Sequence, residues 1–192
     1  MPRRSGNTVA TDEQLAEAAQ RGSAKAFDEL VERYQGRLLR FLLGRCNSRA
    51  DAEDAVQDTF VNVFRYLHSY DPQRRFSTWL YRIALRNASR QPQQMALDPV
   101  EPVDSRDPLV ECIEKSDRQN LWLVAKRALA AEAYSALWLR YVEDLPVRDI
   151  AQAMDRSLAW TKVSLMRSRR RLQTEMRKGS VASGRSKSYE QA

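Results

Sequence analysis

Two kinds of macromolecule-binding side chain stand next to each other in the stretch from residue 51 to residue 84. Asp51, Asp54 and Asp58 recur at helical spacing, which places their carboxylates on one helix face. After a turn signal, the chain becomes rich in arginines and aromatic rings, which suit phosphates and unpaired bases. Because an acidic surface repels DNA, the pattern predicts a basic protein partner for the first segment and nucleic acid for the second.

Helices must position both groups. Thr11 and Gln14 form a capping-box pattern that opens a short helix closing at Gly22. The helix that follows has the clearest apolar periodicity, carried by Phe27, Leu30, Val31, Tyr34, Leu38, Phe41 and Leu42. The acidic helix is predicted to pack through the stripe of Val56, Phe60, Val63, Phe64 and Leu67. Four helices are therefore expected in the first domain.

The last of these helices is predicted to start at a cap formed by Ser77 or Thr78 and to run to about Arg90, where Pro92 stops it. Strand-like alternation and two-residue hairpin turns are absent from the sequence. We therefore expect an all-α fold with two small helical domains joined by a flexible linker.

Composition limits the function classes. The 192 residues carry 32 lysines and arginines against 25 aspartates and glutamates, a net charge of +7 that favours a polyanionic partner. Cys46 and Cys112 lie outside any metal-ligand spacing, so two thiols in a reducing cytoplasm are expected rather than a redox switch. The start resembles no signal peptide and no apolar run could span a membrane, so we expect a cytoplasmic protein without membrane insertion.

The sequence divides into four parts. Residues 11–91 form the first domain, and residues 92–108, with four prolines and mostly acidic charges, form a tether. Residues 109–176 return to helical periodicity, and residues 177–192 form a tail predicted to be disordered.

The second domain contains a helix-turn-helix pattern. A helix that ends near Met154 is followed by a turn at Asp155 and Arg156 and by a second helix that Ser157 caps. From residue 158 to residue 173 the second helix has no acid and several cations, as is typical of a recognition helix in the major groove. Asp155 stands in the turn, where aspartate can adopt the left-handed conformation at modest cost.

The segments DAEDAVQDTFVNVF and FSTWLYRIA resemble region two of bacterial sigma factors, in particular the extracytoplasmic-function (ECF) class. The helix-turn-helix resembles sigma region four, and together the resemblance covers Asp12 to Arg90 and Leu121 to Leu172. It implies that the first domain docks on the clamp helices of the largest subunit of core RNA polymerase and opens the start-proximal promoter element. It also implies that the second domain reads the upstream promoter element and that an anti-sigma factor controls the chain.

The resemblance assigns candidate residues to three surfaces. The polymerase-binding candidates are Asp51, Asp54, Gln57, Asp58 and Phe60. The candidates for start-proximal promoter DNA are Arg75, Phe76, Trp79, Tyr81, Arg82, Arg86, Asn87 and Arg90. The candidates for DNA contact in the helix-turn-helix are Arg148, Ser157, Trp160, Thr161, Lys162, Ser164, Arg167, Arg169 and Arg170.

Two of the aromatic candidates have different expectations. Trp79 is expected to be mostly core with one exposed edge, whereas Tyr81 and Arg82 are expected to contact DNA because they lie beside the apolar positions. The turn glycine common in the family is Asp155 here, and the residues around Lys162 depart from the family pattern, so no promoter consensus is carried over.

Other classes of function remain as alternatives. With one histidine, no phosphate-binding loop and no cluster of metal ligands, the sequence favours neither an enzyme nor a cofactor or metal site. A stand-alone helix-turn-helix regulator with an N-terminal sensor or dimerisation domain would instead bind specific duplex DNA by itself. A structural adaptor that does not contact DNA is disfavoured by the acid-free helix.

Overall fold

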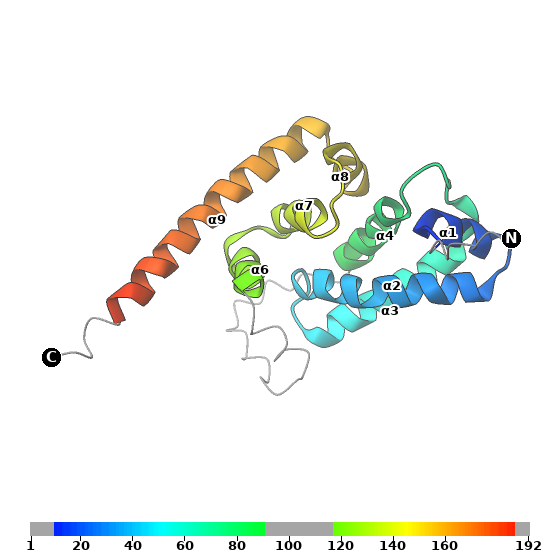
Figure 1. The fold of residues 1–192 in the computed structure, drawn as a ribbon, viewed down its shortest axis with the longest axis horizontal. Helices are drawn as coiled ribbons and strands as arrows, with labels where there is room; N and C mark the ends of the chain where they lie inside the picture. Colours follow the sequence, from blue (N-terminus) through cyan, green and yellow to red (C-terminus); the bar gives the residue numbers. More distant parts are fainter. Residues whose placement is uncertain (1–9, 91–116, 187–192) are drawn as a thin grey trace, which may run out of the picture.

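The computed structural model of the chain describes residues 10–90 and 117–186. Within these ranges every regular element is a helix, and the described residues form no strand. The first range contains α1 (Asp12–Gln20), α2 (Ala24–Leu43), α3 (Arg49–Tyr66), η1 (Leu67–Ser69) and α4 (Phe76–Arg90). The second contains α6 (Asp117–Ala128), α7 (Ala131–Tyr141), α8 (Val147–Ala153) and α9 (Leu158–Ser186), as Figure 1 shows. The all-helical fold is confirmed, and the predicted tether at 92–108 lies outside the described residues.

The start of the first domain follows its local sequence signals. Thr11 N donates to Gln14 Oε1 at 2.9 Å, and Gln14 N donates to Thr11 Oγ1 at 3.2 Å, so the predicted capping box is present. Gly22 has a φ of +96°, in the region that glycine adopts without strain. This conformation turns the chain from α1 into α2.

The start of α4 differs from the prediction. The helix begins at Phe76, whose backbone N–H donates to Glu13 Oε1 of α1 at 3.1 Å. The expectation that Ser77 or Thr78 caps this helix is therefore wrong. A carboxylate is stabilising at a helix N-terminus, but here it comes from a distant helix, which a local pattern cannot reveal.

The core of the first domain forms around α2. Its buried side chains include Leu30, Tyr34, Leu38, Phe41 and Leu42, as the periodicity predicted. Two edge-to-face pairs join α2 to α4: the ring centroids of Tyr34 and Phe76 are 5.6 Å apart, and those of Phe41 and Tyr81 are 5.2 Å apart. Such pairs add to the stabilisation from buried area, so α4 is held firmly against α2.

The buried face of the acidic helix α3 is shifted towards smaller side chains than the predicted stripe. Its buried side chains are Ala52, Ala55, Thr59 and Val63, whereas Phe64 is 68% exposed. The small side chains allow α3 to approach α2 and α4 closely, because the distance between packed helices depends on the residues at their contact. Of the predicted stripe, Val63 and Leu67 are buried and Val56 and Phe60 are half-buried. Phe64 is largely exposed, but its ring packs edge-to-face on Phe27 of α2, with ring centroids 5.2 Å apart.

The second domain contains the predicted helix-turn-helix. α8 is followed by a turn in which Asp155 has a φ of +53°, so the expected left-handed conformation is present. Ser157 Oγ accepts the backbone N–H of Trp160 at 3.1 Å and caps α9, as predicted. Helix α9 continues to Ser186, and Figure 1 shows it reaching past the rest of its domain. This differs from the expectation of a tail without structure at residues 177–186, and residues 187–192 lie outside the described residues.

The two domains pack against each other, chiefly through α4 with α8 and through the C-terminal end of α2. Lys126 Nζ of α6 donates to the carbonyl oxygens of Leu43 at 2.5 Å and Cys46 at 3.3 Å. Arg45 Nη1 donates to Ser135 Oγ of α7 at 2.7 Å. Since the last carbonyls of a helix have no partner within it, the second domain completes the end of α2.

Candidate nucleic-acid and protein interfaces

The outer face of α3 carries acids together with apolar side chains. Asp54, Gln57 and Asp58 are exposed. Val61 on this face is 54% exposed, and Phe64, at its edge beside Phe27 of α2, is 68% exposed. A surface with fixed negative charge beside uncovered apolar area is suited to a protein partner with cations around an apolar centre.

Two of the predicted polymerase contacts have structural roles as well. Asp51 is half-buried and completes a capping box with Ser48, because Ser48 N donates to Asp51 Oδ2 at 3.2 Å and Asp51 N donates to Ser48 Oγ at 3.1 Å. Phe60 is half-buried against the core. The exposed part of the acidic face therefore centres on Asp54 and Asp58. The apolar part of the face was missed, because Phe64 was assigned to the packed stripe.

Exposed arginines lie along α4 and directly before its first residue. The side chains of Arg75, Arg82 and Arg86 are 57%, 34% and 61% exposed. Trp79 is half-buried, with its ring centroid 5.3 Å from that of Tyr70. This agrees with the expectation of a mostly buried ring with an exposed edge. The side chain of Arg90, the last member of the predicted row, lies outside the described side chains.

Three residues predicted to contact start-proximal DNA are buried. Phe76 and Tyr81 have no exposed surface, and Asn87 is 9% exposed. Asn87 Nδ2 donates to Thr59 Oγ1 at 3.3 Å, and Asn87 Oδ1 accepts from Asn62 Nδ2 at 3.0 Å. In this arrangement of the chain the three side chains offer no surface to DNA, because α4 is covered by α2, α3 and α8 and so buries more than one stripe. Their contact with DNA stays a prediction.

A hollow of about 320 Å³ lies beside the exposed edge of Trp79. Thr78 and Arg82 of α4 line it together with Arg75, which directly precedes α4, and Gln152 of α8 also contributes to the lining. The hollow therefore adjoins the aromatic edge and two of the arginines that suit an unpaired base and its phosphates. Its wall from α8 means that the second domain adjoins this position.

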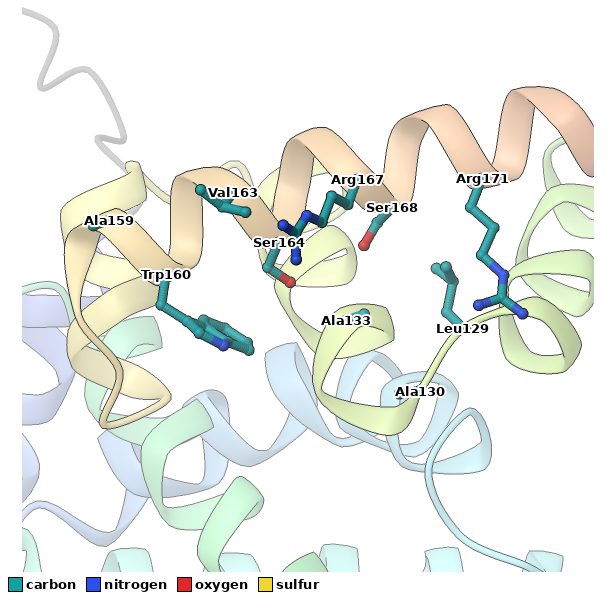
Figure 2. A pocket seen from close by; sticks show the side chains of 10 residues that line it. All are labelled: Leu129, Ala130, Ala133, Ala159, Trp160, Val163, Ser164, Arg167, Ser168 and Arg171. Carbon is teal, nitrogen blue, oxygen red and sulfur yellow. The ribbon is translucent and has the colours of Figure 1, made fainter.

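The DNA-contact candidates of the helix-turn-helix divide between the two sides of α9. Trp160, Ser164 and Arg167 line a groove of about 460 Å³ that faces Leu129 and Ala133, as Figure 2 shows. The candidates on the other side of α9 line a separate hollow of about 430 Å³ and are Lys162, Arg169 and Arg170. Arg148 and Ser157 are exposed outside both hollows.

Thr161 was also predicted to contact DNA, but the structure places it in the core of the second domain. It is fully buried, and its hydroxyl donates to the backbone oxygen of Ser157 at 3.0 Å, one turn earlier in α9. The prediction of DNA contact is therefore wrong, because α9 packs on α6, α7 and α8 through the face that carries Thr161. Neighbouring Trp160 is half-buried, and the Arg156 guanidinium lies 5.4 Å from its ring centroid.

Arginines of α4 form ion pairs with the turn of the helix-turn-helix. Arg82 Nη2 lies 2.8 Å from Asp155 Oδ1, and Arg86 Nη2 lies 3.1 Å from Asp155 Oδ2. Hydrogen bonds from Arg86 and then Arg82 lower the pKa of the Asp155 carboxyl below its ordinary value. The sequence predicted both the arginines and the turn, but not that they meet.

A second ion pair between the domains is deeper. Arg37 Nη2 of α2 lies 2.5 Å from Glu143 Oε2, and the Glu143 side chain has no exposed surface. Burial alone would lower the pKa of Arg37, but the charge and hydrogen bond of Glu143 outweigh it and raise the pKa overall. Burial, together with the nearby charge of Glu143, also raises the pKa of Tyr81. No sequence signal indicated the burial of Glu143, because a lone acid in a connection between helices is usually exposed.

The described residues contain no group of three or more His, Cys, Asp or Glu side chains that could hold a metal ion. None of the described helices is long and apolar enough to cross a membrane. Cys46 is buried, and burial raises the pKa of its thiol. Cys112 lies outside the described residues.

We predict slow alkylation of Cys46 in the folded protein. At pH 8 a raised thiol pKa leaves less of the reactive thiolate, and burial restricts access to it, so iodoacetamide should react at least about tenfold more slowly than in urea. The rate can be followed by mass spectrometry of the peptide that contains Cys46. Equal rates in buffer and in urea would instead indicate an accessible thiolate of the kind that redox sensors use.

These features define a helical protein of the helix-turn-helix class with an additional acidic surface. The family model of sigma-70 region 2 matches residues 30–91. The ECF RNA polymerase sigma-E factor of Haemophilus influenzae is 30% identical over 183 residues, which cover 86% of this chain and 95% of that protein. The sigma-E factor of Escherichia coli K12 is 30% identical over 175 residues, covering 83% and 91%. This chain therefore belongs to the ECF RNA polymerase sigma factors, and the resemblance found in the sequence is confirmed.

The fold is also that of a solved structure. The structure of CnrH in complex with the cytosolic domain of CnrY matches with a TM-score of 0.65, over 87% of this chain and 97% of that chain. The two sequences are 22% identical. The likeness supports the arrangement of helices.

Proposed function

We propose that this chain directs core RNA polymerase to specific promoters and helps to open them. The domain of residues 11–91 would dock on the polymerase and bind the start-proximal element, and the domain of residues 109–176 would bind the upstream element. The observation that carries the proposal is the similarity to sigma-E factors along nearly their whole length. The separation of an acidic face on α3 from cationic faces on α4 and α9 supports it. Work with core polymerase implies a cytoplasmic location.

Docking is assigned to the outer face of α3. Asp54 and Asp58 are exposed one helical turn apart, with Gln57 between them, and Val61 offers apolar area on the same face. Phe64 adds exposed area at the edge of this face, beside Phe27 of α2. Acids give orientation and a fast encounter with a basic helix pair, and a central aromatic ring provides area that is covered on binding. Asp51 and Phe60 would contribute from the half-buried edge of this face.

Promoter opening is assigned to the exposed part of α4. Unstacking a base costs a few kcal/mol, and stacking on an aromatic or guanidinium face recovers part of it. The exposed edge of Trp79 and the side chains of Arg75, Arg82 and Arg86 can supply such contacts. Because these contacts are available only to a separated strand, they favour the open state over the duplex. No catalytic group is needed, since RNA synthesis belongs to the polymerase.

Reading of the upstream element is assigned to the helix-turn-helix. A recognition helix enters the major groove with its first turns while neighbouring cations hold phosphates. Lys162 lies in the first turns of α9, and Arg169 and Arg170 follow on the same side. Trp160, Ser164 and Arg167 lie on the other side, with Arg148 and Ser157 near the turn. On family resemblance alone, we also propose that a cognate anti-sigma factor binds this chain.

The decisive experiment is transcription in vitro with purified core polymerase on fragments of the source genome. The proposal expects discrete transcripts that require both the chain and core enzyme, and weak, salt-sensitive duplex binding by the chain alone. A stand-alone helix-turn-helix regulator would instead bind specific duplex fragments without polymerase. Specific binding of that kind, with no transcript in the presence of core enzyme, would refute the proposal.

We predict that Lys162→Ala reduces promoter-specific transcription about fivefold, the loss typical of one DNA contact of a recognition helix. The test is to measure transcription from a selected promoter fragment and, in parallel, binding of the variant to core polymerase, which should be unchanged. Lys178→Ala is the matched control, because Lys178 is an exposed lysine of the same helix, paired with Glu175 at 3.0 Å. Unchanged transcription by Lys162→Ala would revive the adaptor hypothesis.

A further inference from the structure

The face of α9 that points away from its own domain is apolar in its first turns. The buried side chains of α9 fix the inward direction and are Thr161, Leu165, Ser168 and Leu172. At about 100° per residue, Ala159, Val163 and Met166 fall on the opposite side of the helix. All three are exposed. Because a recognition helix enters the major groove with the outward face of its first turns, these are the side chains that would meet base edges.

The polar groups at the start of α9 are engaged within the domain. Ser157 Oγ accepts the backbone N–H of Trp160 at 3.1 Å, and the Thr161 hydroxyl donates to the Ser157 backbone oxygen at 3.0 Å. Arg156 forms an ion pair with Glu132 and lies against the Trp160 ring. Figure 2 shows Trp160 pointing from α9 towards α7. These groups therefore have roles in the fold, whereas the outward apolar side chains have no such role.

A cation lies at each edge of this apolar face. On one side, Lys162 and Met166 line the hollow that Arg140 also lines. On the other side, Val163 and Arg167 line the groove shown in Figure 2. Val163 is 41% exposed and Met166 is 46% exposed. The cations can hold phosphates on both sides of the helix while the apolar centre lies against the bases.

An apolar side chain in the major groove distinguishes one base from the other three. Thymine presents a C5-methyl group there, and apolar side chains make their specific contact with that group. The other bases present hydrogen-bonding groups, namely the N4 donor of cytosine, the N7 and O6 acceptors of guanine, and the N7 acceptor and N6 donor of adenine. An apolar side chain would remove water from these groups without replacing its hydrogen bonds, which is unfavourable. Valine and methionine therefore favour thymine.

We propose that Val163 and Met166 are specificity-determining residues that read the methyl groups of two thymines in the upstream promoter element. The inference rests on the proposed function, because it takes α9 to lie in the major groove. The two residues are three positions apart, so they lie one above the other on the same helix face and can reach neighbouring base pairs. Burial of one methyl group corresponds to about a fourfold gain in affinity for each contact.

The test uses the full-length chain with core polymerase and a promoter fragment selected by transcription in vitro. In synthetic duplexes, each thymine of the upstream element is replaced singly by uracil. Uracil keeps the pairing with adenine and the O4 acceptor, and lacks only the methyl group, so the comparison isolates the methyl contact. The replaced bases lie outside the transcribed region, so the transcript itself is the same for every template.

The wild-type chain should lose about fourfold in transcription at each of two neighbouring thymine positions, measured at subsaturating polymerase. Val163→Ala should reduce the loss at one position, and Met166→Ala should reduce it at the other. Met176→Ala is the matched control, because Met176 is a methionine of the same helix that is 50% exposed and lies beyond the first turns. It should keep both losses. Each protein is compared with itself on two DNAs, so a change in its stability or its polymerase binding cancels.

Three results would overturn the inference: equal transcription from thymine and uracil templates, a selected upstream element without thymine, or losses that persist undiminished in both Val163→Ala and Met166→Ala. Each of these results leaves promoter-specific transcription in place and so leaves the proposed function intact. The absence of any promoter-specific transcript with core enzyme would instead overturn the proposed function and this inference with it.

Discussion

Replacing both Asp54 and Asp58 by arginine is expected to weaken binding to core RNA polymerase at least about 100-fold, because like charges brought together at an interface cost several kcal/mol. Both side chains are exposed on the outer face of α3, so the change should leave the helical core intact. Co-purification with core enzyme and a titration of labelled protein would measure the loss. Promoter-specific transcription should fall with it.

Asp28→Arg combined with Glu32→Arg is the matched control for that variant. Both residues are exposed acids one turn apart on α2, so the pair makes the same change in net charge at the same helical spacing. Binding should be nearly unchanged, and the circular dichroism of both double variants should match that of the wild type. Equal losses in the two variants would mean that net charge, rather than the α3 face, determines binding.

The parts of the fold that could be predicted depend on neighbouring residues. The capping box at Thr11 and Gln14, the cap at Ser157 and the left-handed Asp155 each rest on contacts within four residues. The buried face of α2 follows from its long apolar period. Such signals place helices and their ends, and they were sufficient here for the fold class.

Burial of Tyr81 on α4 could not be predicted because it depends partly on the other domain. Tyr81 lies beside the apolar positions in sequence, yet it is fully buried. Its neighbour Phe41 also contacts Trp138 of α7, with ring centroids 6.1 Å apart, and the charge of Glu143 acts on Tyr81. A helix covered from several directions buries more than one stripe, and periodicity alone does not reveal how many directions are covered.

The ion pairs of Asp155 with Arg82 and Arg86 could not be predicted for the same reason, because they also depend on how the domains pack. Arg86 and Asp155 are 69 residues apart in sequence, and each also has an ordinary local interpretation, as a promoter contact and as a turn residue. Their pairing follows from how the domains pack, which is a property of the tertiary structure. The sequence therefore predicted the arginines and the turn separately, but it did not predict that Arg82 and Arg86 pair with Asp155.

Gly44→Ala is expected to weaken the packing between the two domains without removing any charge. Gly44, at the end of α2, has φ −76° and ψ −13°, a conformation that alanine also adopts. Its added Cβ would lie 2.1 Å from Cζ and Oη of Tyr134 in the second domain, so the buried ring must move. Overpacking of this kind typically costs about 1–3 kcal/mol. The ratio of molecules with packed domains to molecules with separated domains should therefore fall about tenfold. The distance between spin labels on unnatural residues at Gln35 of α2 and Gln173 of α9 would measure this ratio.

Gly36→Ala is the control, because Gly36 is an exposed residue of α2 whose added Cβ would meet only Arg40 Nη1 at an ordinary 3.6 Å. It should stabilise α2 through helix propensity and leave the domain distance unchanged. If the distance distribution of Gly44→Ala matched that of Gly36→Ala, the Tyr134 ring would have moved aside while the domains stayed packed. The added methyl group would then not separate the domains, and the contact around Gly44 would not control their packing.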